Sequence, residues 1–149
     1  MDKTFFILLE ETRLARERAE EAAERLEAFS SRSTATSRRF TPDGIRGKGR
    51  HSDPTAHSVL GKIALEQNYR AAVDRLVECK CRLERDIDSD PMPDMKRVLY
   101  WRIICEHPWE EICSRLNARY TPRGLQRSIR TLIASNDQGR WRRMLQQAL

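Results

Sequence analysis

The sequence predicts an all-α protein, in which a long antiparallel helical hairpin (a coiled coil) is followed by a small helix-turn-helix bundle. Two long segments, 3–29 and 58–88, repeat apolar residues at alternating spacings of three and four, the pattern of a coiled-coil seam. Segment 109–133 holds two short apolar helical patterns joined by a turn, which is typical of a helix-turn-helix. At 149 residues we expect one domain with a helical extension.

Residues 1–29 are predicted to form the first coiled-coil helix. Glu and Arg occupy most positions off the seam and suit a solvated face. Alanines on the seam bury little area, so the helix needs a partner. The seam residues are Phe5, Leu8, Thr12, Ala15, Ala19, Ala22, Leu26 and Phe29.

Residues 30–57 are predicted to be a basic, flexible loop. The segment has six basic residues against two acidic ones, little apolar periodicity, and several Ser, Thr, Gly and Pro residues. It serves either as a connector or as a basic arm that becomes ordered on DNA or on a protein partner.

Residues 58–88 are predicted to form the second coiled-coil helix. Two such seams fold back as an antiparallel pair within one chain, or exchange between two chains in a homodimer. The pattern leaves both arrangements open. The second seam consists of Leu65, Tyr69, Ala72, Leu76, Cys79, Leu83 and Ile87.

Residues 94–149 are predicted to form the helix-turn-helix domain. Asp94 is the expected N-cap of a supporting helix over 94–106, which is apolar nearly all round. Pro108 is the expected first residue of the next helix. That helix buries Trp109, Ile112, Cys113 and Leu116. A last short helix, after a turn at 136–139, buries Trp141, Met144, Leu145 and Ala148.

The second helix of the turn motif begins with a strong signal, Thr121 as N-cap and Pro122 as first helical residue. One face is apolar and consists of Leu125, Ile129, Leu132 and Ile133. The opposite side carries Arg123, Arg127 and Arg130, with Gln126 on the flank. Neighbouring like charges on a helix repel by a few tenths of a kcal/mol. Binding to phosphates or to the edge of a guanine would make this cluster of arginines favourable. The alternative interpretation is an ordinary basic face exposed to solvent.

The charge of the chain is unevenly distributed. The net charge is +6, but residues 1–93 hold 17 basic and 17 acidic side chains, whereas residues 94–149 hold 11 and 5. A basic excess on the segment with the turn motif is expected of a nucleic-acid-binding protein. We predict DNA contacts by Arg119, Thr121, Arg123, Gln126, Arg127 and Arg130. Contacts to the DNA backbone alone are predicted for Lys96, Arg97, Arg119, Arg142 and Arg143.

Neither a membrane segment nor a metal site is indicated. No run of 18 apolar residues occurs, and the apolar start at 5–9 is followed by acidic residues rather than a cleavage site. Cys79 and Cys81 would point about 200° apart on a helix. Cys105, His107 and Cys113 lack a Cys-x-x-Cys spacing. We therefore expect small core cysteines in a reducing cytoplasm, with no metal and no cofactor.

The C-terminal part resembles region 4 of sigma-70-type factors, where a Trp-x-Glu-Ile helix precedes a capped recognition helix. Over roughly residues 3–135 the chain also resembles a family of phage and prophage proteins with a sigma region 4-like end, related to ArpU-type late transcriptional regulators. The resemblance is most specific at Trp109, Glu110, Glu111, Ile112 and Leu116. Thr121 and residues 128–132 depart from the family pattern, so no base preference is implied. The resemblance implies DNA binding and transcriptional control, without established catalytic residues.

The function expected is that of a DNA-binding transcriptional regulator of phage or prophage origin that reads the major groove. Its partner is double-stranded DNA, with RNA polymerase and a homodimer through the N-terminal helices as further expectations. The alternative is a protein-interaction component, either a polymerase-binding sigma-like decoy or a phage packaging adaptor, that presents Trp109, Glu110 and Glu111. An enzyme is disfavoured, because no histidine has a serine or cysteine at a recognisable catalytic spacing.

Overall fold

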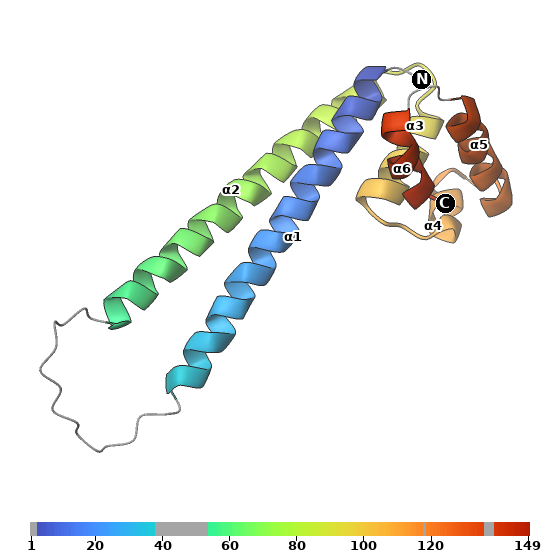
Figure 1. Ribbon diagram of the computed structural model, residues 1–149. Helices are drawn as coiled ribbons and strands as arrows, with labels where there is room; N and C mark the ends of the chain where they lie inside the picture. The colour runs from blue at the N-terminus through green and yellow to red at the C-terminus, as the bar shows by residue number, and fades with distance from the viewer. Residues whose placement is uncertain (1–2, 38–53, 118, 136–138) are drawn as a thin grey trace, which may run out of the picture. The chain divides into compact units, whose positions relative to one another are not determined.

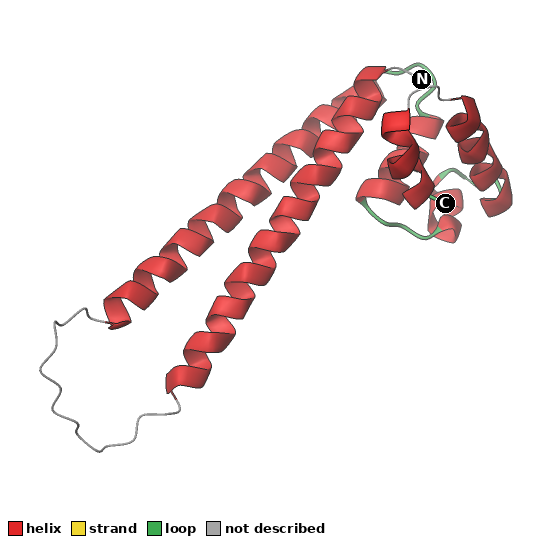
Figure 2. Ribbon diagram, in the orientation of Figure 1, coloured by secondary structure: helices red, strands yellow, loops and turns green. Residues whose placement is uncertain are grey.

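The computed structural model describes residues 3–37, 54–117, 119–135 and 139–149, and all regular structure in these residues is helical (Figure 2). The predicted all-α class is confirmed. No helix in these ranges is long and apolar enough to cross a membrane. The elements are α1 (Lys3–Ser37), α2 (Pro54–Asp88), α3 (Asp94–Leu99), a π-helical segment η1 (Tyr100–Ile104), α4 (Trp109–Arg115), α5 (Pro122–Ser135) and α6 (Gly139–Gln147).

The two long helices α1 and α2 run antiparallel and pack against each other within one chain (Figure 1). Both are longer than predicted, because α1 continues to Ser37 and α2 begins at Pro54. The predicted loop 30–57 was therefore wrong at both ends, and its centre, 38–53, lies outside the described residues. The hydroxyls of Ser30 and Ser31 donate to carbonyls four residues earlier, at 3.0 Å each, so these serines are accommodated inside a helix.

The chain divides into two compact units, which are described separately. The hairpin unit is Ala15–Leu76, and the head unit comprises the residues up to Leu14 together with Val77–Leu149. Among the residues of the hairpin unit whose burial the structure describes, the buried apolar side chains are Ala15 and Ala19, and the other predicted seam residues are half-buried. Gly61 faces the ring of Phe29, where an added Cβ would lie 3.5 Å from the ring. The hairpin therefore closes over small residues, as the predicted seam requires.

The head unit has a core of large side chains drawn from both ends of the chain. The predicted domain began at residue 94, but Phe5, Phe6 and Leu9 of α1 and Leu83 and Ile87 of α2 are buried in the same core. The ring of Phe6 stacks on that of Trp141 of α6, with centroids 5.4 Å apart. The head unit is therefore completed by the first turns of α1 and the last turns of α2.

The predicted supporting helix, 94–106, changes its winding partway. After α3, the backbone N–H of Cys105 donates to the carbonyl of Tyr100, five residues earlier, at 3.3 Å. Glu106, at φ 55°, ends the segment in the left-handed region. The prediction of Asp94 as an N-cap was wrong, because Pro93 holds that position and no side chain caps the helix. The Asp94 carboxylate instead accepts a hydrogen bond from the Tyr120 hydroxyl at 3.3 Å.

The cysteines only partly occupy core positions. Cys79 and Cys113 are buried and Cys105 is half-buried, as expected for small core residues. Cys81 is exposed, so the prediction was wrong for this residue. It lies two positions from Cys79 on α2, and the winding of an α-helix turns it away from the face that Cys79 buries.

Candidate nucleic-acid interface

Helix α4 is bounded by Pro108 before it and by Asn117 after it. Pro108, predicted as the first helical residue, is instead the N-cap of α4 with extended backbone, and its carbonyl accepts from the N–H of Ile112 at 3.1 Å. After α4, Asn117 adopts φ 56°, a left-handed conformation that asparagine tolerates at helix ends. This left-handed residue directly follows Leu116, the C-cap of α4.

The start of α5 is fixed by a side-chain cap, as predicted. The Thr121 Oγ1 atom accepts a hydrogen bond from the backbone N–H of Gly124 at 3.2 Å. A Cβ on Gly124 would lie 3.1 Å from this oxygen, so glycine leaves room for the cap. Thr121 is exposed, but its acceptor role is filled by the helix that it caps.

The apolar faces of α4 and α5 are buried as predicted. Leu125 and Ile129 of α5 are fully buried, and Leu132 and Ile133 are half-buried against the same core. On α4 and its last turn, the buried residues are Trp109, Ile112, Cys113 and Leu116. These contacts fix the rotation of α5, and hence which of its side chains face outward.

The outward side of α5 carries the three predicted arginines. Arg123, Arg127 and Arg130 are exposed, and at 100° per residue they fall within about 60° of the helix circumference. Within the part of the chain that the structure describes, none of the three forms an ion pair. The hydroxyls of Ser128 and Thr131 donate to carbonyls within the helix. We call Arg123, Arg127 and Arg130 the α5 arginine stripe; Gln126 is half-buried at its flank.

The basic residues predicted for backbone contacts differ in their surroundings. Arg119, Arg142 and Arg143 are exposed. Arg97 is half-buried, and its guanidinium lies 3.3 Å from the Asp88 carboxylate. Lys96 is buried, and the prediction that it contacts DNA was wrong.

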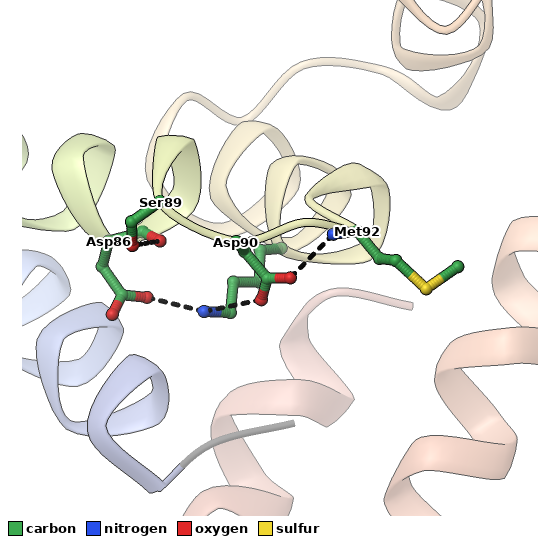
Figure 3. Close-up of polar contacts among 5 residues, drawn as sticks. Asp86, Ser89, Asp90 and Met92 are labelled. Carbon is green, nitrogen blue, oxygen red and sulfur yellow. Dashed lines mark hydrogen bonds and ion pairs between the residues drawn. The ribbon is translucent and has the colours of Figure 1, made fainter.

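The ammonium group of Lys96 is held between two carboxylates at the junction of α2 and α3. It lies 2.9 Å from an oxygen of Asp86 and 2.9 Å from one of Asp90, and 5.3 Å from the centre of the Phe5 ring. Figure 3 shows the polar contacts at Asp86 and Asp90. Asp90 also accepts from the backbone N–H of Met92 at 2.8 Å. Burial alone would lower the pKa of Lys96, but its hydrogen bonds to Asp86 and Asp90 raise the pKa overall. The charge of Lys96 is thus paired inside the head unit, and the buried ammonium group is not accessible to a ligand.

Arg102 was not singled out in the sequence, yet it links three parts of the head unit. Its guanidinium donates to the carbonyls of Ala148 at 3.1 Å and His107 at 3.2 Å. It also lies 5.2 Å from the centre of the Trp109 ring. Its position among apolar residues of the segment 94–106 was the available signal that this arginine is used internally.

The residues that the alternative function would present to a partner are largely engaged. Trp109 is 8% exposed. Glu111 accepts from Arg115 at 2.8 Å and lies 3.1 Å from the His107 Nδ1 atom. The hydrogen bond from Arg115 is the main reason why the pKa of Glu111 is lowered. Only Glu110 of the three is exposed.

A hollow of about 450 Å³ lies beside the start of α5. Its lining includes Met92, which is 84% exposed, together with Tyr120 and Leu125. Arg119 and Asp94 give the hollow one charge of each sign. None of the three arginines on the outward side of α5 lines this hollow.

Neither a metal-binding cluster nor a relative points to another chemistry. In the described ranges, no group of three or more His, Cys, Asp or Glu side chains is placed to hold a metal ion. Comparison of the chain with models of protein families, with curated proteins and with solved structures found no match.

Proposed function

We propose that this protein is a DNA-binding transcriptional regulator that places α5 in the major groove of duplex DNA. The observation that carries the proposal is the α5 arginine stripe, which lies opposite the buried face of the second helix in a helix-turn-helix. Guanidinium groups without an acidic partner in the described chain are available to phosphates and to the O6 and N7 atoms of guanine.

The electrostatics of the stripe favour a polyanionic ligand. Arg123, Arg127 and Arg130 follow one another at spacings of four and three, so they repel one another by a few tenths of a kcal/mol per pair in the free helix. Phosphate contacts remove that cost and add charge-assisted hydrogen bonds. We assign base or phosphate contacts to the stripe and Gln126, and contacts to the DNA backbone to Arg119, Arg142 and Arg143.

The biological setting in this proposal is a bacterial cytoplasm and a phage or prophage gene. It rests on the resemblance of Trp109, Glu110, Glu111, Ile112 and Leu116 to the sigma region 4-like phage regulators. RNA polymerase is included as a partner on the same ground.

A protein-interaction component remains the second candidate, favoured by the hollow beside Met92. The burial of Trp109 and the pairing of Glu111 weigh against the contacts on which this candidate was first based. A salt titration distinguishes the two. Binding through four to six phosphates should weaken with a log–log slope of about −4 to −5. A protein contact should depend on salt far less.

The decisive experiment removes two charges from the stripe. Duplexes selected from a random pool by the purified protein are tested against Arg127→Ala/Arg130→Ala and against Arg18→Ala/Arg85→Ala, which removes the same charge from exposed positions on α1 and α2. We expect the α5 variant to lose about 30-fold or more in affinity, at about 1–3 kcal/mol for each good base contact. The control should bind nearly as the wild type does, and helical content should be unchanged in both. Equal losses in the two variants, or full affinity in the α5 variant, would contradict the proposal.

A further inference from the structure

Helix α2 carries a second apolar line besides the seam that α1 covers. Val59, Ile63 and Val77 are 52%, 44% and 54% exposed, and Val73 is half-buried. At 100° per residue, these positions share one face, which lies roughly 115° around the helix from the seam. Glu66 and Arg70 lie between them on the same face. We call these six residues the α2 stripe.

The α2 stripe is complementary to itself when two copies run antiparallel. Its positions are symmetric about residue 68, so that a second helix in the opposite direction places Val59 against Val77 and Ile63 against Val73. The same register places Glu66 against Arg70. A two-fold axis repeats each contact, so both copies bury the same patch.

The charges in the middle of the stripe select this direction. Glu66 lies 3.8 Å from Lys62, and the two side chains are 40% and 56% exposed, so the pair is weak. Arg70 is exposed and forms no ion pair among the described residues. An antiparallel partner brings Glu66 to Arg70 twice. A parallel partner in register would bring Glu66 to Glu66 and Arg70 to Arg70, which opposes that arrangement.

We propose that the α2 stripe is a dimer interface, on which the stripe of a second copy of this chain packs in the antiparallel direction. The residues from Val59 to Val77 span about 27 Å of helix, at 1.5 Å per residue. The interface adds apolar contacts to α2, whose described seam residues between Leu65 and Leu76 are only half-buried against α1. This inference stands apart from DNA binding, because none of its residues belongs to the α5 arginine stripe.

A charge exchange at the centre tests the interface. The wild-type chain should sediment as a reversible dimer, and Glu66→Arg and Arg70→Glu should each weaken the dimer by about tenfold or more, because each places like charges opposite one another. An equimolar mixture of the two variants should recover a dimer with one chain of each kind. The double variant Glu66→Arg/Arg70→Glu should also dimerise. A monomeric wild type at its highest soluble concentration, or single variants that dimerise as the wild type does, would overturn the proposal.

Cross-linking tests the direction and register. In a Cys81→Ser background, which removes the exposed thiol near the stripe, Val59→Cys and Val77→Cys are prepared separately, mixed and oxidised. The mixture should form a disulfide-linked dimer of unlike chains, because positions 59 and 77 face each other. Each variant alone should not, since equal positions would be about 27 Å apart, well beyond the roughly 7 Å limit for a disulfide. Efficient cross-linking of one variant with itself would show a parallel pair and refute the register.

Discussion

The hairpin unit and the head unit are both helical, but they are stabilised by different side chains. In the described part of the hairpin unit, the buried apolar residues are Ala15 and Ala19, and the larger seam residues are half-buried. In the head unit, Phe5, Leu99 and Leu145 are fully buried. A fully buried large apolar side chain contributes about 1.5–3 kcal/mol, whereas an alanine contributes far less.

Because of this difference in buried side chains, we expect the head unit to be the more stable of the two units. The hairpin unit relies on local pairs such as Arg16 with Glu20 at 2.7 Å and Arg25 with Glu21 at 3.4 Å, each worth a few tenths of a kcal/mol. Its exposed apolar residues on α2 can contact another molecule, and we have proposed that a second copy of this chain packs on them. The head unit has a core large enough to hold α5 in one orientation, which base recognition requires.

The largest expected effect comes from removing the head unit's buried indole. Trp109→Ala should destabilise the head unit by about 3–5 kcal/mol, because it leaves a cavity between α4 and the rest of the core. Urea unfolding followed by tryptophan fluorescence reports on this unit, since Trp101, Trp109 and Trp141 all belong to it. Phe29→Ala, in the hairpin unit, is the control and should shift this transition by about 1 kcal/mol or less. Equal shifts would mean that the two units do not differ in the way described.

A smaller effect is expected from the buried ammonium group. Lys96→Met leaves Asp86 and Asp90 facing each other without a cation, and should cost about 2–3 kcal/mol. This is less than for a fully buried pair, because the two aspartate side chains are 22% and 24% exposed. Arg97→Met, which breaks the exposed pair with Asp88, should change stability by about 0.5 kcal/mol or less. Similar costs for the two variants would contradict the importance of burial.

The ion pairs of Lys96 should make the stability of the head unit depend on pH. The backbone N–H of Met92, and then Lys96, lower the pKa of Asp90 below 3.8, so its contribution is present above that value and is lost as the pH falls through the lowered pKa. Lys96, with its pKa raised above 10.5, contributes fully below that value and loses its contribution only as the pH rises through the raised pKa. The stability gap between wild type and Lys96→Met should therefore be flat from about pH 5 to pH 9 and shrink below about pH 4.

Local patterns in the sequence were sufficient for the buried faces of α4 and α5 and for the start of α5. The buried face of α5 and its Thr121 cap were predicted because both depend on residues within a few positions of one another. The outward position of Arg123, Arg127 and Arg130 follows from the same helical period. Most of the geometry of the candidate interface was therefore available from the sequence.

The errors concern contacts made across the chain. Lys96 was assigned to DNA because its charge is local information, whereas its burial depends on Asp86 and Asp90 being brought to it from α2 and the following turn. Phe6 and Leu9 lie off the predicted seam of α1 and are buried in the same core as residues of α6. The helical stretch from Ser30 to Ser37 was missed because serine and threonine favour loops and caps by propensity, whereas in α1 the hydroxyls of Ser30 and Ser31 donate to carbonyls of the preceding turn.

The smallest expected effect on stability comes from removing the cap at the start of α5. Thr121→Ala removes the acceptor for the Gly124 N–H and should destabilise the head unit by about 1 kcal/mol. Thr131→Ala is the matched control on the same helix: its hydroxyl donates to the Arg127 carbonyl, which is already within the helical ladder, so the change should be close to neutral. The urea midpoint from tryptophan fluorescence separates the two. If Thr131→Ala costs as much as Thr121→Ala, the start of α5 is set by packing of Leu125 and Ile129 rather than by its cap, and the arginine stripe would keep its place without Thr121.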